Sequence, residues 1–346
     1  MEEEFNSLTC EYGGRYIPGK NSNDGLILDS LKQIMAFKNR IVRDVKCLPD
    51  IYIDIINSPD LNASAFLSRS GKYFIGINKG VIEILENDFT YAVNHDKFYE
   101  ESNMSKANSN IYKEMCLKFA LQFLVAHEIS HIRFGHLKYK NTNSNLAEYT
   151  VMQEAYSEHT DDDMIFYQTL EMDADCCGIT TVFNRIMQDR PLIANSDPIS
   201  IAITQAELEI LLYCLSFSVN YINEKLFSPI HKVLRLESIS HPHPGIRQFY
   251  ITTTITTAIN DFINPAMSDS LSKVTAKALS SVMGIMHQID FNKEKFPIYM
   301  AFTKKGNMHT KRIVNNWKDV REVLKPYSYD ELAPYEEFLC NIPILD

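Results

Sequence analysis

The run His127-Glu128-Ile129-Ser130-His131 has the residue types and the spacing of a metal site with its own general base. It lies in residues 121–136, an apolar stretch whose periodicity predicts a buried helix. Side chains four residues apart share one face of a helix, so both imidazoles can reach one ion. Glu128 lies about 100° around the helix from His127, beside the ion rather than bound to it. Two histidines that bind Zn²⁺ and a glutamate that acts as general base are typical of metallopeptidases. The alternative is a pair of core histidines bonded to carbonyl groups, with a solvated glutamate.

A third ligand is needed, because a catalytic zinc ion usually has three protein ligands and a water. Phe134 and Leu137 stand where the spacing HExxHxxGxxH would require Gly and His, which excludes the metzincin arrangement. His136 comes one residue too early for that spacing. We expect it to be structural or to support a ligand from outside the metal shell.

A better candidate follows 40 residues after His131, in a second predicted helix over residues 164–188. Glu171 and Asp175 are four residues apart and share one face of that helix. We therefore expect Glu171 to complete a His2Glu site. Asp175 can accept the free N–H of a zinc-bound imidazole and so fix its tautomer.

Alternatives exist for this acidic run. It could be a solvated helix face, although its apolar neighbours are unusual for one, and Asp173 is the member that we expect to face solvent. The region before the helix is polar, with a short helix predicted over residues 146–157. It contains the rival ligands Glu154, Glu158, His159 and Asp161.

The composition restricts the class of protein. A chain of 346 residues, 45% of them hydrophobic, can form one large domain or two. The net charge of −10 argues against a nucleic-acid partner. The 7 cysteines include no CxxC pair, so neither a disulfide framework nor a cysteine zinc site is indicated. The N-terminus lacks an apolar signal segment, and the most apolar stretch, residues 210–219, is far short of a bilayer span. We expect a soluble, cytoplasmic protein without membrane insertion, of unknown oligomeric state.

The predicted fold class is α+β and mainly α-helical, with a small antiparallel sheet packed on the helix of the HExxH run. We expect an irregular N-terminal segment (1–23), a core (24–262) and a helical C-terminal accessory segment (263–346). Alternation and turn residues predict the strands of the sheet, two of which form a hairpin that turns at residues 70–72; the strands are 51–56, 63–69 and 73–78.

Four segments of the chain resemble the gluzincin clan of zinc metallopeptidases, in the order in which they occur there. HEISH and the later EMDAD are similar to the clan's HExxH and ELDAD boxes. Residues 240–247, SHPHPGIR, resemble the THPxPxxR segment of the HtpX-like branch, which has soluble members. Residues 62–66 and 73–85 resemble its NAxA strand and the edge strand that follows. The EMDAD box close behind the HExxH helix also resembles the Lit-type phage-exclusion peptidases and related soluble bacterial proteins.

The resemblance implies roles for residues at the matching positions. It implies His127, His131 and Glu171 as ligands of one zinc ion and Glu128 as the catalytic base. Asp175 would support a ligand from behind. His241 would approach the metal, as a fourth ligand in a resting state or as a stabiliser of the oxyanion, with His243 the less favoured of the two.

Two further roles concern the substrate. Arg247 would brace the loop of His241 or bind substrate. The strand at 72–78, taken as the edge of the sheet, would hold a peptide in extended form.

The predicted function is a soluble zinc-dependent endopeptidase acting on a protein or peptide, in which Glu128 takes a proton from a zinc-activated water. One alternative is a non-catalytic regulatory or interaction protein whose zinc site is closed by four protein ligands. If His241 supplies that ligand, the chain could also be a latent enzyme that a trigger opens. A zinc hydrolase acting on a non-peptide amide is a third possibility. A role in phage defence rests on the resemblance alone.

Overall fold

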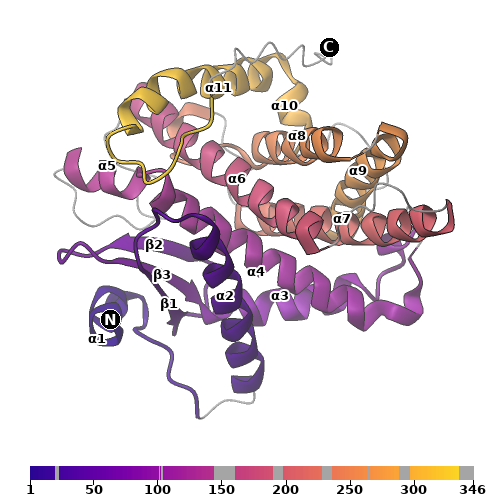
Figure 1. Cartoon of the computed structure of the whole chain (residues 1–346), viewed down its shortest axis with the longest axis horizontal. Helices are drawn as coiled ribbons and strands as arrows, with labels where there is room; N and C mark the ends of the chain where they lie inside the picture. Colours follow the sequence, from indigo (N-terminus) through magenta and orange to yellow (C-terminus); the bar gives the residue numbers. More distant parts are fainter. Residues whose placement is uncertain are drawn as a thin grey trace.

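The computed structural model describes residues 1–19, 23–100, 102, 104–143, 160–189, 198–227, 236–263, 265–287 and 297–334. Most of these residues are helical, and one small sheet lies at one end of the molecule, opposite the last long helix (Figure 1). The mainly α-helical α+β class is confirmed. The possible short helix at 146–157 and the rival ligands Glu154, Glu158 and His159 fall outside the described residues.

The N-terminal segment is not irregular, as the sequence had suggested. Residues Glu2–Thr9 form helix α1, and a 3-10 turn follows over Cys10–Tyr12. Phe5 of α1 is fully buried against Tyr52 and Phe74 of the sheet. The prediction failed because the helix is short and owes its stability to this tertiary contact rather than to a periodic pattern.

The sheet has three strands, β1 (Ile51–Ile56), β2 (Ala63–Leu67) and β3 (Tyr73–Asn78), in the order β1-β3-β2. The hairpin of β2 and β3 is confirmed, with Gly71 at φ 79° in its turn. However, β1 pairs with β3 in parallel, so the sheet is mixed and the antiparallel prediction was wrong. The prediction of 72–78 as the edge strand was also wrong, because β3 is central and β2 lies at an edge.

The long helix α4 (Ser109–Arg133) carries the HExxH run and is buried along most of its length. It packs most extensively against α6 (Asp161–Asp189) and also contacts β2, α2 (Asp24–Asp44) and α3 (Lys79–Ala92). Gly178 allows this close packing, since a Cβ there would lie 3.1 Å from the backbone nitrogen of His127. Two helices from distant parts of the sequence are thereby brought face to face at the HExxH run.

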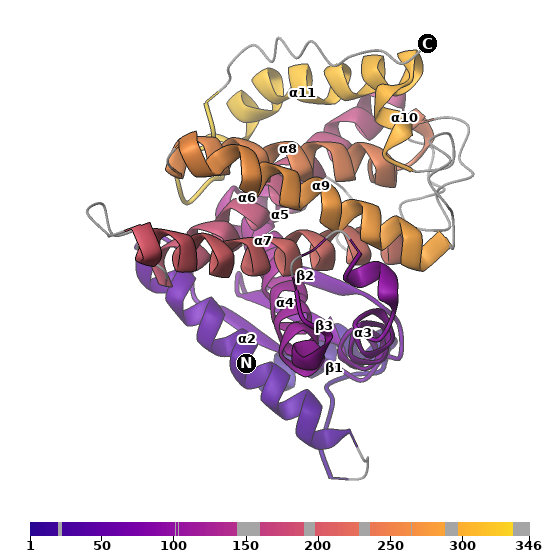
Figure 2. The ribbon, with the colours of Figure 1, turned by 90° about the vertical axis from the view of Figure 1, so that its right-hand side faces the viewer.

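Helix α7 (Pro198–Phe227) is the most apolar helix of the chain. Its segment Ala202–Leu226 is long and apolar enough to cross a membrane, but half of that window is buried inside the protein. It crosses the middle of the molecule in Figure 2 and packs against α4, α8 (Pro244–Phe262) and α9 (Pro265–His287). These contacts are those of a helix in the interior of the fold.

The C-terminal part of the chain shares the core of the rest. Helix α11 (Lys304–Leu324) packs on α6, and the short helix α10 (Tyr299–Phe302) packs on α8. After α11 the chain returns toward the short helix α5 (His136–Asn143), as the yellow loop in Figure 1 shows. There Tyr329 donates a backbone hydrogen bond to the carbonyl of Arg133, at the C-terminus of α4. We call residues 325–334 the C-terminal strap.

Candidate metal centre

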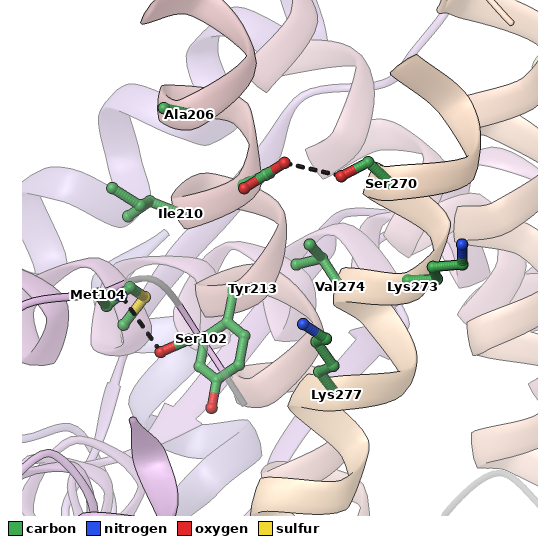
Figure 3. Close-up of a pocket in the computed structure, with 10 residues that line it drawn as sticks. Ser102, Met104, Ala206, Ile210, Tyr213, Ser270, Lys273, Val274 and Lys277 are labelled. Carbon is green, nitrogen blue, oxygen red and sulfur yellow. Dashed lines mark hydrogen bonds between the residues drawn. The ribbon is translucent and has the colours of Figure 1, made fainter. Parts of the chain in front are cut away.

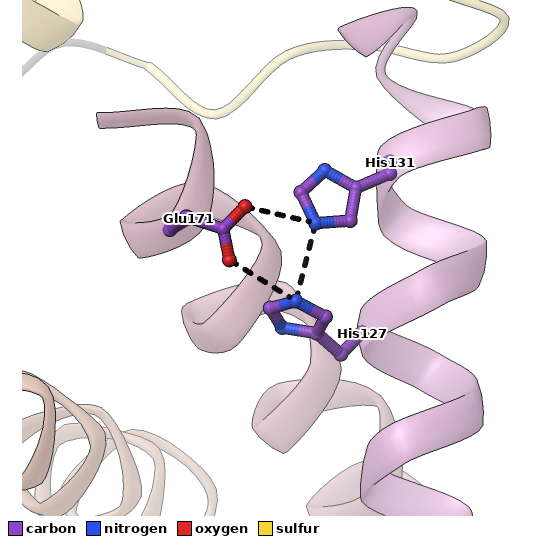
Figure 4. A group of neighbouring side chains, drawn as sticks. All are labelled: His127, His131 and Glu171. Atoms are coloured by element: carbon purple, nitrogen blue, oxygen red, sulfur yellow. Dashed lines mark hydrogen bonds and ion pairs between the residues drawn. The ribbon is translucent and has the colours of Figure 1, made fainter. Parts of the chain in front are cut away.

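Three side chains that the sequence predicts as metal ligands meet between α4 and α6 (Figure 4). The Nε2 atoms of His127 and His131 lie 3.1 Å apart, and the carboxylate oxygens of Glu171 lie 3.4 and 3.5 Å from them. A tetrahedral ion with bonds of about 2.0–2.1 Å separates its ligands by roughly 3.3–3.4 Å. All three side chains are buried. The triad is therefore arranged so that it could hold a metal ion.

The outer nitrogen of His127 faces a carboxylate. Its Nδ1 lies 2.9 Å from Oδ1 of Asp175, one turn along α6 from Glu171. A carboxylate at this distance favours a proton on Nδ1 of His127. Asp175 thus lies behind His127, where the sequence predicts it.

Asp175 is held in turn by two side chains of α8. Arg247 donates to both of its oxygens, at 2.7 and 2.6 Å, and Tyr250 donates to Oδ2 at 3.2 Å. Burial would raise the pKa of Asp175, but the Arg247 guanidinium outweighs it and holds that pKa below its usual value. Asp175 therefore remains a carboxylate although it is fully buried. Arg247 braces the triad from behind.

His131 has a different support, which the sequence did not suggest. Its Nδ1 lies 3.0 Å from Nδ1 of His136, and Nε2 of His136 lies 3.2 Å from Oδ2 of Asp173. Asp173 is only 5% exposed, so its assignment to solvent was wrong. Gly135, with φ 78°, reverses the chain after α4 and brings His136 beneath His131. We refer to His131, His136 and Asp173 as the histidine relay.

The triad attracts positive charge. Burial disfavours the charged form of His127, yet Asp175 and Glu171 outweigh it and raise its pKa to about 10. For Glu171 the histidines outweigh burial and hold its pKa well below the usual range. Burial, by contrast, keeps the pKa of His131 well below its usual value. The three side chains of the triad all direct acceptor atoms at one point, which favours a positive charge there. Without a metal, a proton on His127 supplies that charge.

Glu128 lies beside the triad on α4 and is 6% exposed. Burial raises the pKa of its carboxyl group to about 7, although His127 and, to a smaller extent, the backbone of Ala65 in β2 act in the opposite direction. A carboxyl group with a pKa near neutrality can both accept and return a proton at physiological pH. The influence of the Ala65 backbone and the packing of α4 on β2 place this group near the edge strand of the sheet.

Of the two histidines that each precede a proline in residues 240–247, one faces the triad. Nε2 of His241 lies 3.6 Å from Oε2 of Glu171, and its Nδ1 lies 3.0 Å from the hydroxyl of Ser240. Burial lowers the pKa of His241 to about 4, so the ring is neutral at physiological pH. His243 instead accepts the backbone N–H of Gly245 and caps α8.

Two other features lie apart from the triad. Asp161, the one rival ligand among the described residues, is exposed in the first turn of α6. A pocket of about 210 Å³ lies between α7 and α9, with Met104, Ile210 and Val274 in its lining (Figure 3). Its lining contains no histidine, cysteine or aspartate, so it offers no second site of this kind of chemistry.

Comparisons of the chain with protein-family models, with curated proteins and with solved structures give no match. The case for a function therefore rests on the geometry of the residues above.

Proposed function

We propose that this chain is a zinc-dependent endopeptidase of gluzincin type. The observation that carries the proposal is the triad of His127, His131 and Glu171 with a buried carboxyl group, Glu128, next to it on the same helix. Two imidazole nitrogens and one carboxylate oxygen are a set of ligands typical of catalytic zinc, which keeps a fourth position open. The spacing of about 3.1–3.5 Å between these atoms suits an ion of that size.

A zinc ion bound by the triad would act as a Lewis acid, polarising a carbonyl group and lowering the pKa of a water. The residues of the chain supply the proton transfers. Glu128, with a pKa of about 7, accepts a proton from the attacking water and returns it to the leaving amine. His241 lies at the same site and is neutral, so its ring can donate to the oxyanion that forms on the substrate.

The edge strand β2 suits an extended peptide as substrate. Its even-numbered residues bond to the hairpin partner, as the contacts Ser68–Lys72 and Asn78–Asn62 on either side of it show. Its odd-numbered residues, among them Ala65, therefore direct their backbone groups outward. No strand among the described parts of the chain pairs with that edge. A peptide added to β2 would pass close to Glu128, because α4 packs against β2 and the Ala65 backbone affects the pKa of the Glu128 carboxyl group.

The test compares wild type with Glu128→Gln for metal content and for cleavage of an unstructured protein such as casein. We expect zinc in both proteins at about one ion per chain and cleavage by the wild type alone. Glu171→Ala should lose the metal, because it removes one of three ligands. Cleavage by Glu128→Gln at the wild-type rate would exclude the assigned base. Full metal occupancy in Glu171→Ala would exclude the ligand set.

A second candidate is a non-catalytic or latent protein with a closed zinc site. The observation that favours it is the position of His241, 3.6 Å from a ligand oxygen and therefore within reach of a fourth coordination position. If His241 closes the site, His241→Ala should release activity that the wild type lacks. If His241 serves the reaction, the same variant should lower activity. Amide substrates without a peptide backbone test the third class, a non-peptide hydrolase, since they cannot pair with β2.

The cellular location and the kinds of partner are also part of the proposal. A cytoplasmic location, no membrane insertion and no nucleic-acid partner are consistent with the net charge of −10 and with the packing of α7 inside the protein. Assignment to the Lit-type peptidases, and with it a role in phage defence, would follow from cleavage that depends on a phage-derived trigger.

A further inference from the structure

The loop that leads to His241 is held by one buried side chain, Gln168. Its amide nitrogen donates to the carbonyl oxygens of Leu236 and Ile239, each at 2.7 Å. Gln168 is fully buried on α6, three residues before Glu171, and therefore about one helical turn away from it. The loop and the metal ligand are thus fixed to the same stretch of helix.

The other end of the Gln168 amide bonds to the C-terminal part of the chain. Its Oε1 accepts a hydrogen bond of 2.7 Å from Nε2 of His309, on α11 and 141 residues away in sequence. Nδ1 of His309 in turn lies 3.6 Å from Oε1 of Glu237, in the same loop. Both N–H groups and the oxygen of Gln168 are engaged, so the amide has one orientation that satisfies all its partners.

The far side of the loop is restrained as well. Helix α8 begins at Pro244, directly after His243, and a Cβ on Gly245 would lie 1.6 Å from the carbonyl oxygen of Pro297. The start of α8 therefore presses against the chain just before α10. His241 lies between these two restraints, and its distance to Glu171 depends on both.

We propose that Gln168 is a positioning residue, which holds His241 at the metal centre and links it through His309 to helix α11. The role rests on the proposed function, because it assumes that His241 acts at the metal centre. The C-terminal segment thereby helps to position the site, although it contributes no metal ligand.

The test uses Gln168→Leu, which keeps the approximate volume and removes all three hydrogen bonds. Gln248→Leu is the matched control, because Gln248 is also a fully buried glutamine, but its side-chain amide donates to Glu224 of α7 and not to the loop. Metal content, kcat and the imidazole carbon resonance of His241 are measured in the zinc-loaded full chain. The resonance is assigned with His241→Ala.

We expect Gln168→Leu to retain the metal, to shift the His241 resonance and to lower kcat about 10- to 100-fold, because a misplacement of about 1 Å can have an effect of that size. The double variant with His241→Ala should be no slower than the slower single variant, since both act through one group. Gln248→Leu should leave the resonance unchanged. Effects that multiply in the double variant, or equal effects of both leucine substitutions, would overturn the proposal.

A second variant and a second measurement test the positioning role if Gln168→Leu does not fold or if the wild type is inactive. If Gln168→Leu does not fold, Gln168→Glu keeps the shape and removes the donated N–H groups, with the same expected shift. If the wild type cleaves nothing, the proposed peptidase activity fails but the resonance still decides. A His241 signal that moves in Gln168→Leu alone supports the positioning role, and an unchanged signal rejects it.

Discussion

Arg247 and Asp175 form a bidentate ion pair directly behind His127, with nitrogen-to-oxygen distances of 2.7 and 2.6 Å. Both side chains are buried, at 5% and 0% exposure. The pair joins α8 to α6 at the level of the triad. It makes the orientation of a metal ligand depend on a residue that lies 120 positions from it in sequence.

Asp175→Asn tests whether this pair serves the metal as well as the fold. We expect metal affinity to fall about 10- to 100-fold, because the variant weakens the hold on the ring of His127. The free energy of unfolding of the metal-free protein should also fall, by about 3–5 kcal/mol, since Arg247 loses its buried counterion. Competition with a chelator measures the first quantity and urea denaturation the second. Loss of stability with unchanged affinity would assign Asp175 to the fold alone.

His136→Ala tests the histidine relay on the other ligand. The ring of His131 would lose its partner at Nδ1, so metal affinity should fall about 10- to 100-fold. Asp173→Asn should act in the same direction and more weakly, because it changes only the outer member of the relay. His287→Ala is the matched control: that histidine bonds to Glu224, and its loss should leave metal affinity unchanged. Equal affinities in His136→Ala and His287→Ala would contradict the relay.

Glu128→Gln should stabilise the metal-free protein at high pH. The folded state raises the pKa of this carboxyl group from 4.5 to about 7. Between these values the folded state binds the proton more tightly than the unfolded chain, so stability falls as pH rises and the penalty is complete above pH 7. The variant should exceed the wild type by up to ~3 kcal/mol at pH 8, with the difference vanishing near pH 4. Urea denaturation at both pH values measures it, and a difference independent of pH would refute the buried carboxyl group.

Metal binding should release a proton. The pKa of His127, about 10 without metal, means that the ring is protonated at pH 8, and the ion requires its bare Nε2. We expect release of about one proton per ion and an affinity that rises with pH up to about 10. Calorimetry in two buffers with different ionisation enthalpies counts the protons. Binding without release at pH 8 would show that His127 is neutral in the metal-free protein.

The candidate site was more predictable from the sequence than the fold around it. His127 and His131 can be predicted as a pair because helical periodicity is local: residues four apart must share a face. Glu171 was predicted because a zinc site needs a third ligand and a second apolar helix carries this acidic run. Asp175 follows by the same rule from Glu171. Asp173 was wrongly predicted to face solvent. Its partner, His136, lies next to it only because the chain reverses at Gly135, and no periodic pattern predicts that reversal.

Long-range pairings could not be predicted in this way. The sheet was taken as antiparallel because a hairpin is visible in sequence, whereas the parallel pairing of β1 with β3 skips over β2. For the same reason residues 72–78 were taken as the edge strand. The bond between Gln168 and His309 spans 141 residues, and neither residue has a spacing that marks it. Such contacts depend on how whole helices pack, which the sequence pattern of each helix leaves open.

The C-terminal strap affects the order in which contacts around the triad can form during synthesis. Asp330 pairs with Arg133 at the end of the metal helix, and Tyr329 shares a hydrogen bond between tyrosine hydroxyls, of 3.0 Å, with Tyr73 of the sheet. Translation proceeds from the N-terminus, so Tyr329 and Asp330 emerge after both helices of the triad have been synthesised. The histidine that tethers Gln168 also emerges late. The contacts that hold the end of α4 and the loop of His241 can therefore form only after the two helices that carry the triad have left the ribosome.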